Sequence, residues 1–185
     1  MEYQAMWAPW SGPGLEHLRL SVDDEGVRAD GLIIGVADDG PFRLRYSVRC
    51  DGAWRVREVR AVRLDLAIAP VALRADGLGN WTTPEGDPVH ELAGCIDIDL
   101  SGSPFTNTLP IRRLALPLGA THDLTMAYIR VPELTVMPDP QRYTRLAADC
   151  YLYESGDSDF RAELPLDAAG LVLDYPGIAR RVWPQ

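Results

Sequence analysis

The chain contains 185 residues, of which 46% are hydrophobic, so it can bury one sizeable core and we expect a single domain over residues 1–185. All 18 basic residues are arginine, which excludes chemistry that needs a Schiff-base or P-loop lysine. The formal net charge of −9 disfavours nucleic acids and anionic lipid surfaces as partners, because both require a basic face.

The hydropathy pattern predicts a cytoplasmic protein without a transmembrane segment. No apolar run approaches the roughly 20 residues that cross a bilayer, and the N-terminus lacks the basic and apolar regions of a signal peptide. Cys50, Cys95 and Cys150 are widely spaced without a CxxC pair, so we expect reduced thiols. The three histidines are isolated from other ligands. We therefore predict no metal ion and no cofactor.

Alternation of apolar and polar residues predicts β-strands in the N-terminal half. Residues 17–22 and 42–50 alternate with a period of two, and the second segment places four apolar side chains and Cys50 on one face. Between Trp54 and Leu66 the apolar phase changes twice, which predicts β-bulges near Glu58 and Ala61. Asp-Gly turns separate the segments at short intervals, as in antiparallel meanders.

Residues 95–100 form a further predicted strand that carries two carboxylates. The alternation places Asp97 and Asp99 on one face, opposite the apolar side chains of the segment. At a rise of about 3.3 Å per residue their Cα atoms lie about 6.6 Å apart, near the carboxyl separation of an inverting glycosidase. A catalytic pair flanks a bond from two sides, whereas these neighbours point the same way. We favour ion pairs with arginines of an adjacent strand.

The loop predicted after this strand, residues 101–108, is rich in hydroxyl groups and contains an amide. Such side chains line a sugar-binding rim or satisfy backbone groups of a tight loop, and the sequence does not choose between these roles.

Aromatic residues mark a predicted strand near residues 145–153. Tyr151 and Tyr153 share a face with Arg145 and Asp149. Tyrosine rings with polar neighbours stack on sugar rings or lipid headgroups, although ordinary packing within a sheet is the favoured interpretation.

The C-terminal part continues the strand pattern over residues 159–166. Helical turns are expected only as short pieces, near residues 175–181, because no window of a dozen residues keeps a 3.6-residue apolar stripe free of proline or glycine. Residues 46–81 and 151–177 share an order of strand, acidic turn and strand, which points either to an internal duplication or to the recurrence of Asp-Gly turns.

A resemblance to a known family rests on residues 94–114, which read GCIDIDLSGSPFTNTLPIRRL. This run closely resembles the signature of the putative glycolipid-binding family of bacteria. Three further segments support it: PFRL at 41–44, QRY at 141–143 and GLVLDYPG at 170–177.

The resemblance implies an all-β protein with few short helices, in which a large curved antiparallel sheet forms a half-barrel or flattened barrel. Such a sheet is similar to those of bacterial lipoprotein-localisation factors. The family supplies no agreed catalytic residues, so the resemblance identifies residues 95–111 only as a candidate site. A lipoprotein carrier would require export, and the missing signal peptide argues against that role.

Three hypotheses about function follow. The first is non-enzymatic binding of a lipid-like or glycolipid-like amphiphile in a groove of the curved sheet, with residues 97–107 offering polar contacts at its mouth. The alternatives are a hydrolase or transferase that acts on a glycosidic or ester bond with Asp97 and Asp99, and a β-sheet interaction module such as a homodimer. No catalytic residue or metal ligand is assigned. The candidate ligand-binding residues are Asp97, Asp99, Ser101, Ser103, Phe105, Asn107, Arg112, Tyr143, Tyr151 and Tyr153.

Overall fold

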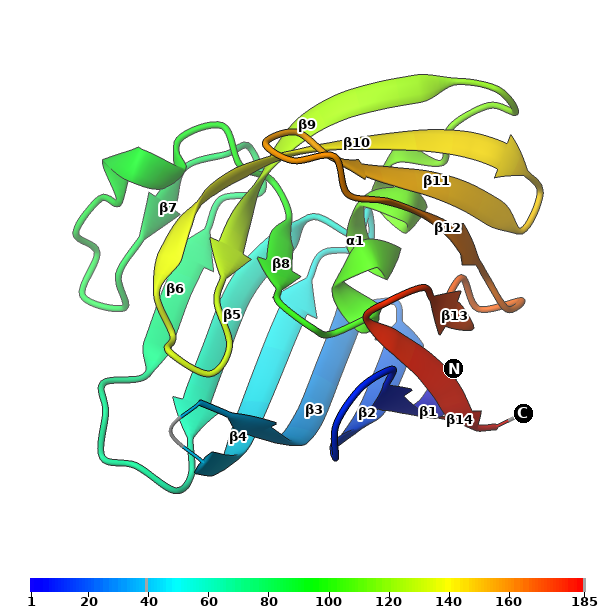
Figure 1. Ribbon diagram of the computed structural model, residues 1–185. Helices are drawn as coiled ribbons and strands as arrows, with labels where there is room; N and C mark the ends of the chain where they lie inside the picture. The colour runs from blue at the N-terminus through cyan, green and yellow to red at the C-terminus, as the bar shows by residue number, and fades with distance from the viewer. Residues whose placement is uncertain (39, 185) are drawn as a thin grey trace.

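The computed structural model describes residues 1–38 and 40–184, which form two β-sheets with a helix between them (Figure 1). The larger sheet, sheet A, is antiparallel throughout and has the strand order β13-β14-β1-β2-β3-β4-β5-β6-β7. Its strands are β1 (Glu2–Pro9), β2 (Leu15–Asp23), β3 (Gly26–Ala37), β4 (Gly40–Cys50), β5 (Val56–Arg63), β6 (Val71–Ala75), β7 (Trp81–Thr82), β13 (Asp174–Tyr175) and β14 (Ala179–Trp183).

The smaller sheet, sheet B, curls over the first as a half-barrel in the order β12-β11-β10-β9-β8. Its only parallel pair among the described residues is β8 with β9, which are joined by a long connection that contains the helix. The prediction of an all-β protein with a large curved antiparallel sheet is confirmed. The elements of this half are β8 (Ile98–Leu100), α1 (Phe105–Leu114), β9 (Thr121–Ile129), β10 (Val136–Ala147), β11 (Cys150–Ser155) and β12 (Arg161–Pro165), preceded by a 3-10 turn, η1 (His90–Leu92).

Alternation determines which side chains of sheet A reach the interior. On β4 the predicted inward residues are buried and the arginines between them are exposed, as the period of two requires. The inner face of sheet A packs against β8 and α1, and a second apolar cluster joins the end of α1 to sheet B. Cys50 and Cys95 are buried free thiols and Cys150 is partly buried, in agreement with the expected reduced state.

One of the two predicted bulges is present. Arg49 pairs with Glu58 while Cys50 pairs with Val56, so Arg57 is the extra residue of a bulge. The second predicted bulge, near Ala61, is wrong, because the pairing with β4 continues in register there. Arg63 takes the next inward position after Ala61, while Leu64 and Leu66 are exposed, so the apolar phase changes there without a bulge.

The position of the helix also differs from the prediction. The segment expected to contain helical turns, residues 175–181, contributes to β13 and β14, whereas α1 occupies residues 105–114. Residues 105–111 are all buried, including Pro110 within the helix. Because the polar residues of this stretch are buried together with the apolar ones, no amphipathic stripe marks it in the sequence, and only the last turn, with Arg112, reaches the surface. Contacts with both sheets, rather than local periodicity, determine this helix.

The two segments that resemble each other in sequence occupy different surroundings. Residues 46–81 lie within sheet A, whereas residues 151–177 are divided between β11 and β12 of sheet B and β13 of sheet A. An internal duplication stays a prediction.

Within the described part of the chain, α1 is the only α-helix, and neither it nor η1 is long and apolar enough to cross a bilayer.

Candidate functional site

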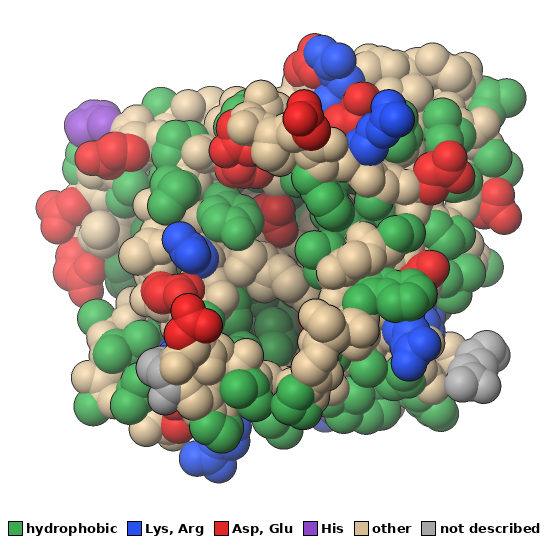
Figure 2. Space-filling view, viewed as in Figure 1, with side chains coloured by type: hydrophobic (Ala, Val, Ile, Leu, Met, Phe, Trp, Pro, Cys, Tyr) green, Lys and Arg blue, Asp and Glu red, His purple; other side chains and the backbone are tan. Residues whose placement is uncertain are grey.

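A pocket of about 380 Å³ lies between the two layers, on the face seen in Figure 2. That view shows the surface hollowed between the sheets, with hydrophobic side chains inside the hollow. The β1–β2 turn, the far ends of β3 and β4, the loop before α1 and the start of β14 meet here, and most of the side chains that they contribute are apolar. The lining residues are Trp7, Pro9, residues 11–16, residues 33–36, Phe42, Ser101, Gly102, Val131, Ile178 and Ala179.

A hollow lined by both apolar and charged side chains adjoins this pocket. It has a volume of about 610 Å³, shares Val36, Phe42 and Val131 with the pocket and extends to Leu66 and Ile68. The last two side chains are exposed although they are large and apolar. Together the two hollows form a groove between the β3–β4 hairpin and the β9–β10 loop.

The only charged residue that lines the pocket, among those described, is Glu16 of β2. It is 4% exposed and lies between Trp7 of β1 and Ile33 of β3 in the inward row of sheet A. Its Oε1 accepts hydrogen bonds from the hydroxyls of Tyr46 at 2.5 Å and Ser103 at 2.6 Å. Its Oε2 has no partner among the described residues. Burial raises the pKa of Glu16 to about 7, against the opposing effect of the two hydroxyls.

Gly31 allows Tyr46 to reach Glu16. Tyr46 belongs to β4, two strands away from Glu16, and its ring crosses β3 above Gly31. A Cβ at position 31 would lie 2.1 Å from Cζ of the tyrosine ring, a distance at which the ring must move. The glycine is therefore required for this contact.

We expect Gly31→Ala to lower the free energy of unfolding by about 1–3 kcal/mol, the usual cost of overpacking, because the Tyr46 ring and its bond to Glu16 are displaced. Urea denaturation measures the change. Gly52→Ala is the matched control, since a Cβ there meets open space, and it should change stability by less than about 0.5 kcal/mol. Equal effects of the two substitutions would contradict the assigned role of Gly31.

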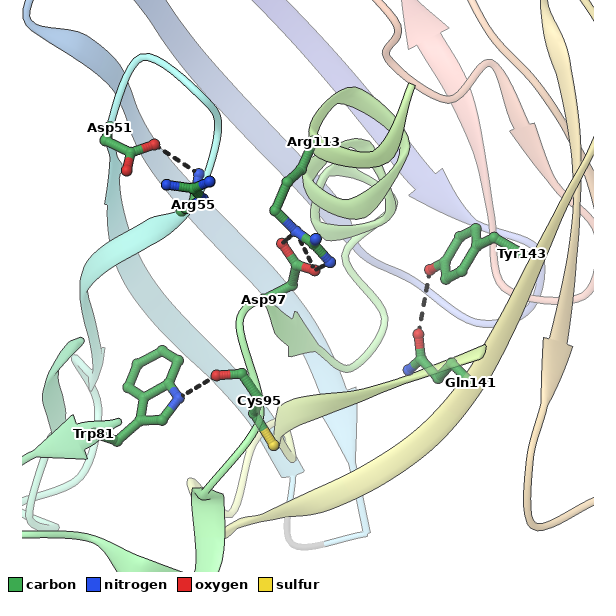
Figure 3. Close-up of polar contacts among 8 residues, drawn as sticks. All are labelled: Asp51, Arg55, Trp81, Cys95, Asp97, Arg113, Gln141 and Tyr143. Atoms are coloured by element: carbon green, nitrogen blue, oxygen red, sulfur yellow. Dashed lines mark hydrogen bonds and ion pairs between the residues drawn. The ribbon is translucent and has the colours of Figure 1, made fainter. Parts of the chain in front are cut away.

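Asp97 is fully buried in an ion pair with Arg113 of α1 (Figure 3). Nε of the arginine donates to both carboxylate oxygens at 3.0 Å, and Nη2 donates to Oδ2 at 2.6 Å. Burial raises the pKa of Asp97, and the guanidinium opposes this rise. The expected pairing with an arginine of an adjacent strand is corrected, because the partner comes from the helix. The strand itself begins only at Ile98, so Asp97 precedes it.

Asp99 has different partners from Asp97. Gln141 Nε2 donates to its Oδ2 at 2.7 Å and also to Asp139 Oδ2 at 2.8 Å, and the Thr106 hydroxyl donates to its Oδ1 at 3.0 Å. Burial raises the pKa of Asp99 to about 6. No arginine pairs with it among the described residues, contrary to expectation. The two aspartates therefore belong to separate networks, Asp97 with Arg113 and Asp99 with Gln141 and Thr106.

The hydroxyl-rich segment after β8 is only partly a loop, because α1 begins at Phe105. Ser101 lines the pocket and its hydroxyl accepts the backbone N–H of Val131 at 2.8 Å. Ser103 reaches the pocket wall through its bond to Glu16. The hydroxyl of Thr108 donates to the Gly170 carbonyl at 2.9 Å. These hydroxyls satisfy internal groups, and Ser101 and Ser103 do so beside the pocket.

Phe105, Asn107 and Tyr143 connect the helix to both sheets. The Phe105 ring stacks on Tyr46 with a centroid distance of 6.3 Å. The Tyr143 hydroxyl lies 2.8 Å from Asn107 Oδ1 and 3.2 Å from Gln141 Oε1, the second contact being visible in Figure 3. All three predicted residues are buried inside the protein and away from the pocket lining.

The expected single strand near residues 145–153 is a hairpin. Arg145 of β10 pairs with Tyr151 of β11, and Tyr143 pairs with Tyr153, with the turn at residues 148–149 between the strands. Tyr153 packs edge-on against Tyr143 at a centroid distance of 5.5 Å. The two tyrosines of β11 are buried at 3% and 6% exposure, so their rings mainly pack within the protein.

Arg112 and Tyr151 line another hollow, of about 580 Å³, at the end of α1. The Arg112 guanidinium lies 5.2 Å from the centroid of the Trp54 ring. The ten predicted residues thus occupy three places: the inter-sheet pocket, the interior around α1, and this second hollow. Glu16 was absent from the prediction. Extending the alternation of residues 17–22 back by one position places it inward, which is the signal that would have found it.

Comparisons with known proteins agree with this fold. The family model described as putative glycolipid-binding matches residues 4–181. The chain is similar to a solved structure, the crystal structure of a DUF1089 family protein from Pseudomonas aeruginosa, with 38% sequence identity, a TM-score of 0.85 and 95% of each chain covered. No curated protein matches the chain.

Proposed function

We propose, because this chain belongs to the putative glycolipid-binding family, that it is a non-enzymatic protein that holds a lipid-like or glycolipid-like amphiphile in its inter-sheet pocket. The observation that carries the proposal is an apolar pocket between two sheets whose wall contains one buried, incompletely bonded carboxyl group. Small-molecule sites combine apolar walls with a few placed polar groups in just this way.

The dimensions of the pocket support a small amphiphile. Its volume of about 380 Å³ falls in the lower part of the range of roughly 300–1,000 Å³ that is typical of ligand pockets. The adjoining hollow, with exposed Leu66 and Ile68, offers further apolar surface for a chain too long for the pocket. Exposed apolar surface of this kind favours contact with another apolar group over contact with water.

A substitution that fills the pocket tests the proposal. Ile33 lies opposite Glu16 and lines the pocket, so Ile33→Trp should weaken binding of octyl glucoside at least about tenfold in isothermal titration calorimetry, below the micelle concentration. Leu32→Trp is the control, because Leu32 is the preceding residue of β3, points to the outer face and does not line the pocket. Equal affinities of both variants and the unmodified protein would overturn the proposed site.

A second measurement identifies what the protein carries. Mass spectrometry of a solvent extract of the purified protein should detect an amphiphile that is reduced in amount in Ile33→Trp and retained in Leu32→Trp. An extract that contains no amphiphile, together with no binding of added octyl glucoside, would contradict the proposed function.

A further inference from the structure

The carboxyl group of Glu16, a residue of the pocket wall, has one oxygen that is buried and lacks a hydrogen-bond donor. Both donors that reach the carboxyl group, Tyr46 and Ser103, are bonded to Oε1, while Oε2 is unpartnered within the described chain. An unsatisfied buried acceptor destabilises the folded protein, and more so when it is charged, so such groups are rare. A bound molecule that donates to Oε2 would remove this destabilisation.

Neither of the neighbouring polar side chains, Trp7 and Ser101, donates to Oε2. The indole N–H of Trp7, beside Glu16 on β1, donates to the Val172 carbonyl at 2.7 Å. The hydroxyl of Ser101 accepts the backbone N–H of Val131. Trp7, Glu16 and Ala179 are the most deeply buried side chains of the pocket wall, at 1%, 4% and 4% exposure, whereas the β1–β2 turn at residues 11–13 is exposed. The unpartnered oxygen therefore belongs to the buried part of the wall of a mainly apolar pocket.

The chemistry of a buried carboxyl group selects among possible ligands. A hydroxyl group suits either protonation state, because it donates to a carboxylate and accepts from a carboxylic acid. A ligand carboxylate would be repelled by ionised Glu16, and an ammonium group would have to lose its hydration to form a buried ion pair. We infer, on the basis of the proposed function, that the ligand enters with a hydroxyl group foremost and donates it to Oε2 of Glu16, while its apolar part packs against the pocket walls.

Two isomeric probes test this inference. Octanol carries the hydroxyl donor, whereas heptyl methyl ether has the same atoms without it. At a pH above 8, where Glu16 is ionised and can only accept, octanol should bind the unmodified protein at least about tenfold more tightly in calorimetry, because the ether cannot donate a hydrogen bond to the carboxylate. In Glu16→Leu this preference should disappear. Glu16→Gln, which keeps an acceptor for Tyr46 and Ser103, should fold normally and reduce the preference.

Octyl glucoside distinguishes the two sources of a hydroxyl group. If Glu16→Gln weakens the binding of octanol, the hydroxyl group belongs to an alkyl chain. If it weakens the binding of octyl glucoside alone, the hydroxyl group belongs to a sugar. Both results support the inference. Equal affinities of octanol and the ether, with octyl glucoside unaffected by Glu16→Gln, would overturn the inference and leave the proposed function intact. If none of the three probes binds, both are overturned.

Discussion

Replacing Arg113 by methionine should lower the free energy of unfolding by about 3–5 kcal/mol, because it leaves the buried carboxylate of Asp97 without its partner. Asp97 is 0% exposed, and the guanidinium supplies three hydrogen bonds to it. The loss reflects an uncompensated buried charge rather than the net value of the ion pair. Urea denaturation at neutral pH measures the change.

The control for this prediction is Arg142→Met, which removes an ion pair with Asp123 on the surface of sheet B. Both partners are more than half exposed, so solvent screens the pair and the expected loss is much smaller than that of Arg113→Met. Adding Asp97→Asn to Arg113→Met removes the stranded charge and should restore part of the lost stability. Similar losses from Arg113→Met and Arg142→Met would contradict a structural role for the buried pair.

The stability of the ligand-free protein should fall as the pH rises through neutrality, and Glu16 should cause a large part of this fall. Its pKa of about 7 in the folded protein exceeds its ordinary value of 4.5, which the unfolded chain is expected to have. Between these values the folded protein holds a proton that the unfolded chain has released. The stabilisation is therefore complete below the pKa of the unfolded chain and is lost as the pH rises through the pKa of the folded protein.

Between pH 5 and pH 8, Glu16 should lower the free energy of unfolding by about 2–3 kcal/mol, since one pKa unit corresponds to about 1.4 kcal/mol. Asp99, whose pKa is raised to about 6, contributes in the same direction. Comparison of the unmodified protein with Glu16→Gln therefore isolates the contribution of Glu16. Urea denaturation across this pH range should show the two proteins diverging, with Glu16→Gln losing less stability. Parallel curves would show that Glu16 is not a buried, protonatable group.

The sequence predicts those features of the fold that depend on local alternation. The inward face of β4 and the bulge beside Glu58 follow from a period of two and its interruption. The change of phase near Ala61 does not mark a bulge, because a buried arginine at position 63 imitates one in the apolar pattern. Alternation reports the face on which a side chain lies, but not which polar side chains a tertiary contact will bury.

The candidate site depends on contacts between distant parts of the chain, which a single sequence does not reveal. The resemblance directed attention to residues 94–114, and this segment does supply Ser101 and Ser103 beside the pocket. Glu16 is 87 residues from Ser103 and joins it only because α1 and its preceding loop pack onto sheet A. The helix itself, buried over residues 105–111 and containing Pro110, carries no local signal of its conformation.

Crystals of the protein soaked with bromooctanol, which carries bromine at the end opposite its hydroxyl, give the most direct test of the central claim that the inter-sheet pocket holds an amphiphile. Anomalous diffraction should place the bromine within the pocket or the adjoining groove, with the chain against Ile33 and Ile178. Bromine found only on the outer faces of the sheets, with an empty pocket, would contradict the account.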